Sequence, residues 1–172
     1  MTHPPGMPRA CVVAFLDPPG CRPVEDLRAR WDPVSAAEVA AHVTLVYPEE
    51  FPCGLDPADV AAAAATATSP FRIAVGGAFH PGSPADGVFL RVEDLDGGIA
   101  RFRAAAALPG TPACLPAHVT VVHPRAPGGE RAWAEVSGLR ISARFTVSRV
   151  AVTVHDGTRW QSPRVMPLAG PA

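Results

Sequence analysis

The chain has 172 residues, 48% of them hydrophobic, with 15 glycines and 21 prolines, which predicts one domain with a sizeable core and many loops. All 15 basic residues are arginine and the formal net charge is −1, so no overall positive charge supports tight binding to long nucleic acid. No apolar stretch is long enough to span a membrane, and no secretory signal is recognisable. Four cysteines without a Cys-x-x-Cys pair favour reduced thiols in the cytoplasm.

Short apolar runs punctuated by Pro, Gly and Asp predict a mixed order of strands and helices. In chain order we expect a strand at 10–16, helices at 24–31 and 35–41, a strand at 43–47, a helix at 57–68, strands at 71–79 and 88–92, a helix at 95–108, a loop at 109–116, a strand at 119–123, a helix at 130–136, and strands at 139–143, 145–154 and 159–168, the last two joined by a turn at Asp156-Gly157. Pro23 suits the start of the first helix, and Asp56 suits the N-cap of the third. Because the strands cluster rather than alternate strictly with helices, the fold class is predicted to be α+β.

One short motif occurs twice in the chain. Residues 41–48 read Ala-His-Val-Thr-Leu-Val-Tyr-Pro, and residues 117–124 read Ala-His-Val-Thr-Val-Val-His-Pro. The flanking residues favour strands, and alternate side chains of a strand share a face, so each motif places a His and a Thr together. The repeat predicts two pseudo-symmetric lobes, each with an antiparallel sheet, an Ala-rich helix and one motif, around a central cleft.

Two histidines on opposite sides of a substrate can divide acid and base chemistry between them. A neutral imidazole takes a proton from water, and a protonated one gives a proton to the leaving oxygen. Threonine hydroxyls beside them donate hydrogen bonds to an anion. The pair of motifs therefore predicts in-line displacement at a phosphodiester, with His42 and His118 as catalytic residues and Thr44 and Thr120 as phosphate-binding residues.

Three other interpretations fit the same motifs. The repeat is a structural relic without chemistry, or the cleft binds a nucleotide or RNA end without cleaving it, or the protein is a metal-dependent hydrolase. The spacing His-x-Thr is not that of metal ligands, and neither His-Glu-x-x-His nor a Gly-rich phosphate loop occurs. Tyr47 and His123 lie at odd offsets from the motif histidines, which places them on the opposite strand faces as packing or rim residues.

Paired His-x-Thr motifs in the two halves of a chain of this length resemble the two-histidine phosphoesterase superfamily. Its members include bacterial enzymes called 2′-5′ RNA ligases or RNA 2′,3′-cyclic phosphodiesterases. The opening strand with Asp17-Pro18-Pro19, the segment 27–33 with Trp31-Asp32-Pro33, and the final hairpin with Trp160 are similar to the same family. The resemblance covers most of the chain.

The resemblance implies one bilobal domain over residues 1–172 that hydrolyses 2′,3′-cyclic phosphates or 2′-5′ linkages of nucleotides or RNA. It implies His42 and His118 as general acid and base, in an order that two such similar motifs leave open. It also implies no metal and no cofactor. We expect a monomer with no membrane or protein partner.

Arginine is concentrated in the C-terminal part of the sequence. After Ser137 the chain has a single acidic residue, Asp156, and five arginines, which are Arg140, Arg144, Arg149, Arg159 and Arg164. These arginines are candidates for contacting an anionic substrate, or else they decorate a solvated hairpin. The near-neutral total charge favours a short substrate such as a nucleotide or an RNA end.

Overall fold

A computed structural model describes residues 9–18, 20–51, 54–108, 115–156 and 159–170. Its strands are β1 (Arg9–Phe15), β2 (His42–Val46), β3 (Phe71–Phe79), β4 (Val88–Asp94), β5 (His118–Val122), β6 (Ala143–Val147), β7 (Arg149–His155) and β8 (Trp160–Pro167). Its α-helices are α1 (Arg22–Trp31), α2 (Pro33–Glu38), α3 (Pro57–Thr66), α4 (Gly98–Ala106) and α5 (Gly129–Val136), with 3₁₀ turns at Pro48–Glu50 and Pro84–Asp86. The predicted α+β class is confirmed.

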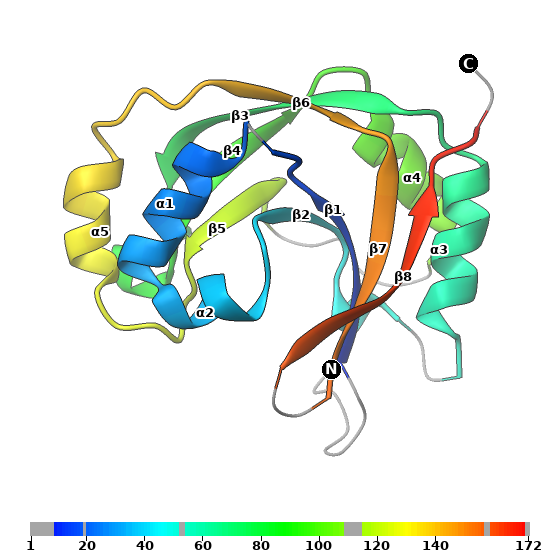
Figure 1. The fold of residues 1–172 in the computed structure, drawn as a ribbon, viewed down its shortest axis with the longest axis horizontal. Coiled ribbons are helices and arrows are strands. Elements are labelled where there is room, and N and C mark those ends of the chain that lie inside the picture. The colour runs from blue at the N-terminus through cyan, green and yellow to red at the C-terminus, as the bar shows by residue number, and fades with distance from the viewer. Residues whose placement is uncertain (1–8, 19, 52–53, 109–114, 157–158, 171–172) are drawn as a thin grey trace.

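Two antiparallel four-stranded sheets form the frame of the molecule (Figure 1). The first has the order β2-β1-β7-β8 and the second the order β5-β4-β3-β6. Both motif strands, β2 and β5, are therefore edge strands, and each pairs antiparallel with one neighbour, β1 or β4. The two motif strands thus occupy corresponding edge positions in the two sheets, which confirms the predicted pseudo-symmetry of the sheets.

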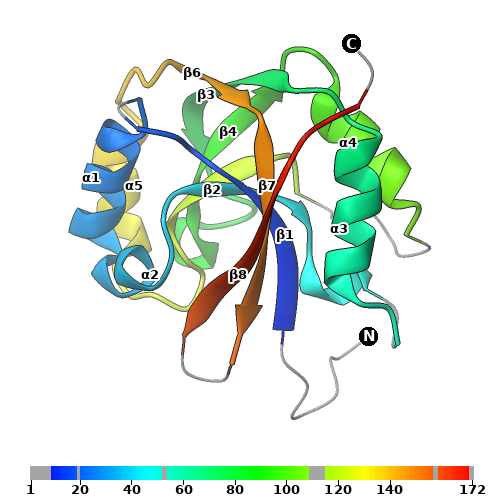
Figure 2. The same cartoon turned by 45° about the vertical axis from the view of Figure 1, so that its right-hand side comes forward.

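Two helices pack against the motif strand of the other half of the chain. α1 precedes the first motif but contacts β5, the second motif strand, whereas α4 comes from the second half and contacts β2. Figures 1 and 2 show α3 and α4 on one side of the molecule and α1, α2 and α5 on the other. This exchange places side chains of each half behind the motif strand of the other.

One apolar cluster runs through both lobes. It joins the inner residues of the two sheets to the Ala-rich face of α3, with Phe71, Phe102, Leu45 and Ile73 among its largest fully buried side chains. A smaller cluster of Cys11, Val13 and Ala151 lies on the opposite side of the first sheet. Burial of apolar surface at about 25 cal/mol per Å² is the main force that holds the two lobes together.

Two strand predictions near the C-terminus are wrong. Residues 139–142 are not in a strand, because the Leu139 N–H donates to the Val136 carbonyl and completes the turn that ends α5. The predicted strand 145–154 is interrupted at Ser148, where the chain leaves the second sheet (β6) and enters the first (β7). A continuous apolar pattern in the sequence does not reveal where the chain passes from one sheet to the other.

The helix predictions hold in number but differ in their ends. The helix expected at 35–41 is α2, which begins at Pro33 because Asp32 accepts the Ser35 N–H. α4 begins at Gly98 rather than at residue 95, because the Asp94 carboxylate accepts the first free N–H groups of the helix. The loop at 109–116 and the turn at 156–157 lie largely or partly outside the described residues.

In the described part of the chain, no helix is both long and apolar enough to cross a bilayer.

Candidate active site

The two motif strands lie side by side although they belong to different sheets. β2 and β5 contact each other along the line where the two sheets meet. Along each motif strand the burial alternates in the same way: His and Thr are half-buried, and the Val and Leu residues between them are buried. His42, Thr44, His118 and Thr120 are the half-buried residues of these two adjacent strands, and together they are called here the motif face.

Both motif histidines are oriented by the same main-chain contact. The His42 Nδ1 lies 2.8 Å from the Ala40 carbonyl oxygen, and the His118 Nδ1 lies 2.8 Å from the Pro116 carbonyl oxygen. A carbonyl oxygen only accepts, so each Nδ1 carries hydrogen and donates it. The proton that each ring gains or loses is therefore on Nε2, as general acid–base catalysis requires.

The threonine hydroxyls of the motif face make no hydrogen bond to any described residue, although the Thr120 carbonyl does. The Thr44 and Thr120 hydroxyls are thus available to donate to a bound anion. Two free hydroxyls beside two oriented imidazoles match the oxygen atoms of a phosphate group.

Burial lowers the pKa of both motif histidines. For His42 the pKa falls to about 4, first through burial and then through the nearby positive charges of Arg28 and His118, against the raising effect of its bond to Ala40. For His118 burial also lowers the pKa, and its bond to Pro116 opposes that shift. Both rings are neutral at pH 7 in the free protein, and an anionic ligand would favour their protonation.

The low pKa of the His42 ring can be measured directly by NMR. Long-range ¹H–¹⁵N spectra of the free protein should show the His42 ring still neutral at pH 5, and added inorganic phosphate should raise its pKa. Because the unfolded ring titrates near 6.5, the unfolded state binds more protons between about pH 6.5 and 4, so His42 makes unfolding easier as pH falls through that window. A His42 ring that is protonated at pH 6 without ligand would contradict the prediction.

Aromatic side chains surround the motif histidines. The Phe89 ring centroid lies 4.5 Å from that of His118, and the Phe79 ring meets His118 edge-on at 6.1 Å. Phe15, on the neighbouring strand, meets His42 edge-on at 6.0 Å. These rings pack against the imidazoles and contribute to the burial that lowers the pKa of the imidazoles.

Tyr47 was expected on the opposite face from the first motif, and this prediction is wrong. β2 ends at Val46, so the strand alternation stops there, and the Tyr47 ring lies 6.5 Å from the His118 ring of the other lobe. Burial, followed by the charge of Glu50, raises the pKa of Tyr47 to about 12, so its phenol is protonated. For His123, the corresponding residue after the second motif strand, the main-chain N–H donates a hydrogen bond to the Asp32 carboxylate.

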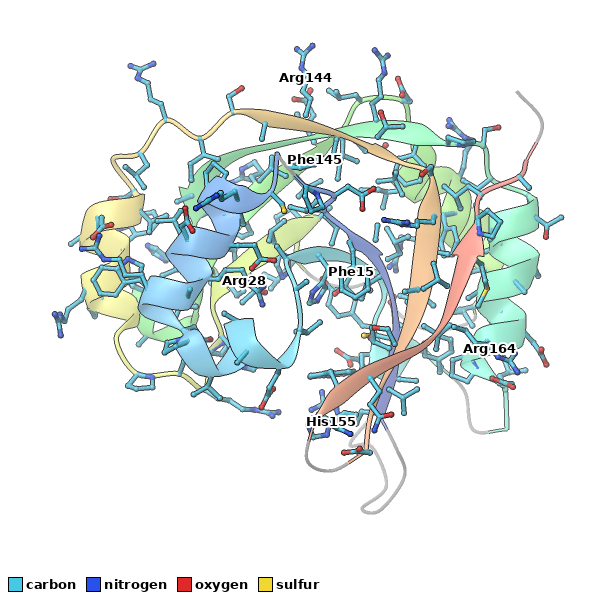
Figure 3. All side chains as sticks on the ribbon, in the orientation of Figure 1. Phe15, Arg28, Arg144, Phe145, His155 and Arg164 are labelled. Atoms are coloured by element: carbon cyan, nitrogen blue, oxygen red, sulfur yellow. The ribbon has the colours of Figure 1, made fainter. Side chains whose placement is uncertain are left out.

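Three of the five C-terminal arginines, Arg144, Arg149 and Arg164, lie on the outside of the molecule or in an ion pair. Figure 3 shows Arg144 and Arg164 projecting from the outside of the molecule, whereas Phe15 and Arg28 lie in its middle. Arg149 is paired with Asp17. These positions favour the solvated-hairpin interpretation.

Arg91 is the exposed cation that sequence reasoning missed. It pairs across the sheet with His118, and its guanidinium lies 4.8 Å above the centre of the Phe79 ring. Within the described residues it forms no ion pair. The available sequence signal was an arginine between Leu90 and Val92 in a predicted strand, where alternation places it on the face opposite its apolar neighbours.

Buried charge is concentrated behind the motif strands. Arg28, Asp32 and Glu50 are 3%, 3% and 5% exposed, and they are the buried charged residues among those that the structure describes. Asp32 accepts the His123 N–H at 2.9 Å, and Glu50 accepts the Tyr47 N–H at 2.7 Å, so a carboxylate holds the end of each motif strand. Charges are costly to bury, and here each is satisfied by several hydrogen bonds.

The exchanged helices supply one arginine to each motif strand. From α1, Arg28 donates to the Thr120 carbonyl of β5 at 3.1 Å. From α4, Arg103 donates to the Leu45 carbonyl of β2 at 2.6 Å and pairs with Glu50. The contacts are reciprocal, so each half of the chain supports the edge strand of the other.

No group of three or more His, Cys, Asp or Glu side chains suited to a metal ion is found in the described residues. Cys11 and Cys21, the two cysteines that the structure describes, are free and buried.

The sequence matches a family model along most of its length. The model of the 2′-5′ RNA ligase superfamily covers residues 16–159, a range that includes both His-x-Thr motifs. Among curated proteins, a sequence search finds no relative of this chain.

Solved structures share the fold. TT0787 of Thermus thermophilus matches with a TM-score of 0.67 and 17% identity, over 95% of this chain and 100% of that one. LigT of E. coli in complex with NADP+ matches with a TM-score of 0.61 and 14% identity, over 95% and 99% of the two chains. LigT in complex with 3′-AMP matches with a TM-score of 0.56 and 13% identity, over 94% and 98%. At these identities the likeness concerns the fold alone.

Proposed function

The chain belongs to the 2′-5′ RNA ligase superfamily of two-histidine phosphoesterases, and on this premise we propose that it is a metal-independent phosphodiesterase that opens 2′,3′-cyclic phosphates of nucleotides or RNA ends. The observation that carries the proposal is the pair of His-x-Thr strands, whose imidazoles are both fixed through Nδ1 with Nε2 left for proton transfer. We take residues 1–172 as one bilobal unit, acting as a monomer without a cofactor in the cytoplasm.

The reaction follows from the chemistry of the four motif residues. One neutral imidazole removes a proton from water as the water oxygen bonds to phosphorus. The other imidazole, protonated once the anionic substrate is bound, gives its proton to the ribose oxygen as the P–O bond breaks. Thr44 and Thr120 donate hydrogen bonds to the non-bridging oxygens, whose negative charge grows in the transition state.

Two further observations support a nucleotide-sized substrate. Crystals of the fold relative LigT contain NADP+, 3′-AMP or ATP. In this chain, Arg91, which forms no ion pair with a described residue, and Phe79 provide a cation and an aromatic ring next to His118, which suit a phosphate and a base. The nucleotide ligands of LigT and the Arg91–Phe79 pair of this chain both fit a short substrate better than a long RNA helix.

A hydrolysis assay tests the proposal. A panel of 2′,3′-cyclic nucleotides is incubated with the protein in EDTA, and the expected result is steady production of 2′- or 3′-nucleotides. Activity that disappears in EDTA and returns with zinc would support the metal-dependent alternative instead. Tight binding of the cyclic nucleotide without turnover would support the non-catalytic binding module.

A 2′-5′ linked dinucleotide belongs in the same assay. Its cleavage without turnover of cyclic nucleotides would keep the phosphodiesterase assignment but replace the cyclic substrate.

A further inference from the structure

The two motifs are almost identical in sequence, but the strands beside them carry different residues. In the first sheet, β1 places Phe15 directly opposite His42. In the second sheet, β4 places Arg91 directly opposite His118. Residues that lie opposite each other on antiparallel strands project from the same face of the sheet. One motif histidine therefore has an apolar neighbour on its face, and the other has a positive charge.

Arg91 stands outside the pair of motif strands. β2 and β5 contact each other, and β4 lies on the side of β5 that faces away from β2. Neighbouring strands are about 4.8 Å apart, so the main chain of Arg91 is set back from the second motif by one strand spacing. Its guanidinium is held over the Phe79 ring, which belongs to β3, the next strand outward. This position suits an anion beside the reacting phosphate better than the reacting phosphate itself.

The charge of Arg91 is available to a ligand. The residue is exposed, and among the described residues no carboxylate forms an ion pair with it. Glu93, the next residue of β4 on the same face, is exposed and does not neutralise Arg91 through an ion pair in the described ranges. Arg72 of the neighbouring strand differs, because its guanidinium is paired with Asp96 at 2.8 Å. Arg91 therefore keeps an uncompensated charge next to the second motif.

Aromatic rings are concentrated on the same side of the site. Phe79 and Phe89 contact the His118 ring from its own sheet, and Tyr47 approaches it from the other sheet. Beside the first motif histidine the neighbouring ring is that of Phe15. Aromatic rings next to a cation match a nucleoside and a phosphate attached to it. This arrangement favours a nucleoside on the side of the second motif, with its further phosphate toward β4.

We propose that Arg91 forms a second phosphate site, which binds a phosphate attached to the 5′ oxygen of the nucleoside whose cyclic phosphate reacts at the motif face. The inference rests on the proposed function, because it requires the reacting phosphate at the four motif residues. A 2′,3′-cyclic phosphate occupies both the 2′ and the 3′ oxygen, so a further phosphate is attached through the 5′ oxygen. The preferred substrate is therefore an RNA end or a 5′-phosphorylated nucleotide, and not a cyclic nucleotide without a second phosphate.

Three substrates test the second phosphate site. They are adenosine 2′,3′-cyclic phosphate, the same compound with a 5′-phosphate, and a dinucleotide that ends in adenosine 2′,3′-cyclic phosphate. For wild type we expect kcat/KM to be about tenfold higher when a 5′-linked phosphate is present, mainly through a lower KM, because this contact lies away from the reacting bonds. Preference for either compound supports the site, and the better one identifies a terminal phosphate or an RNA end as its source.

Variants of Arg91 connect this preference to the guanidinium. In Arg91→Gln the preference should fall to about twofold or less, and Arg91→Lys, which keeps the charge, should retain most of it. Both variants should fold, because the side chain is exposed. An equal loss of activity toward all three substrates in Arg91→Gln would place Arg91 at the reacting phosphate and overturn the proposal. A wild-type protein without the preference would overturn it as well.

Arg30→Gln is the matched control. Arg30 is also exposed and lies over an aromatic ring, that of Trp31, at 5.2 Å. It belongs to α1, however, and is paired with Glu135 of α5. Removing its charge should change neither the rate nor the preference. An equal loss of the preference in Arg30→Gln and Arg91→Gln would show an effect of total charge and overturn the second phosphate site.

Nucleotide binding separates this inference from the proposed function. Adenosine 3′,5′-bisphosphate and 3′-AMP offer the same phosphate to the motif face, and only the first has a 5′-phosphate. Calorimetry of the wild type should show the bisphosphate bound about tenfold more tightly, with the difference lost in Arg91→Gln and reduced by added NaCl. This result would stand if no cyclic phosphate were hydrolysed, a failure that defeats only the phosphodiesterase. Equal affinities in the wild type would overturn the second phosphate site.

Discussion

Replacing either motif histidine with alanine should reduce the hydrolysis of 2′,3′-cyclic nucleotides by about 100- to 10,000-fold. Each variant removes one of the two imidazoles that the proposed reaction needs for proton transfer, one to take the proton of water and one to protonate the leaving oxygen. Each variant should keep the wild-type fold, because both side chains are only half-buried and their rings bond to main-chain carbonyls of loop residues. The measurement is kcat/KM in EDTA, with circular dichroism and thermal unfolding of the same samples.

The double variant sharpens this test. If the two histidines act in one step, His42→Ala/His118→Ala should be little slower than either single variant, because residues that act as a unit have non-additive effects. His155→Ala serves as control, since this ring packs against Trp160, and Figure 3 shows His155 apart from Phe15 and Arg28. A single variant that kept near wild-type activity while the protein stayed folded would rule out the two-histidine mechanism.

Removing the threonine hydroxyls should weaken transition-state binding without changing the shape of the site. In Thr44→Val and Thr120→Val the side-chain volume is kept, and each variant loses one hydrogen bond to the phosphate. A hydrogen bond to a charged group contributes about 1.5–3 kcal/mol, which corresponds to roughly 10- to 150-fold in kcat/KM. The loss should appear mainly in kcat, because the charge on the non-bridging oxygens grows in the transition state.

Serine variants distinguish a lost hydroxyl from altered packing. Thr44→Ser and Thr120→Ser retain the donor and should keep most of the activity. Thermal unfolding of the valine variants should be close to that of wild type, since neither hydroxyl bonds to a described residue. Equal losses in the serine and valine variants would show that the threonines pack the site rather than bind phosphate.

Much of the site could be predicted from the sequence because the relevant signal is local. A strand with alternating buried and half-buried residues fixes which side chains share a face, so the duplicated motif placed His42 with Thr44 and His118 with Thr120. The same local logic located the Ala-rich helix α3 and its N-cap Asp56, which accepts the Ala58 N–H. It failed at Tyr47, where the strand ends one residue earlier and the alternation no longer applies.

The contacts between the halves could not be predicted, because they depend on how distant segments pack. The packing of α1 against β5 and of α4 against β2 is visible only when both sheets are assembled. Arg28 and Arg91 are ordinary arginines in the sequence. They differ from the C-terminal arginines only because the fold buries one behind Thr120 and places the other opposite His118.

The sequence by itself determined the strand character of the motifs, the pairing of His with Thr on one face, the α+β class and the family. Each of these depends on neighbours within a few residues, where backbone geometry is the same in every fold. Only the tertiary structure decided that the two motif strands lie edge to edge, that the chain changes sheets at Ser148, and that Arg28 is buried behind Thr120 while Arg91 lies opposite His118. These contacts join residues that are far apart in the chain, so they form only when the chain is folded, whereas the faces of a strand are fixed by its nearest neighbours in sequence.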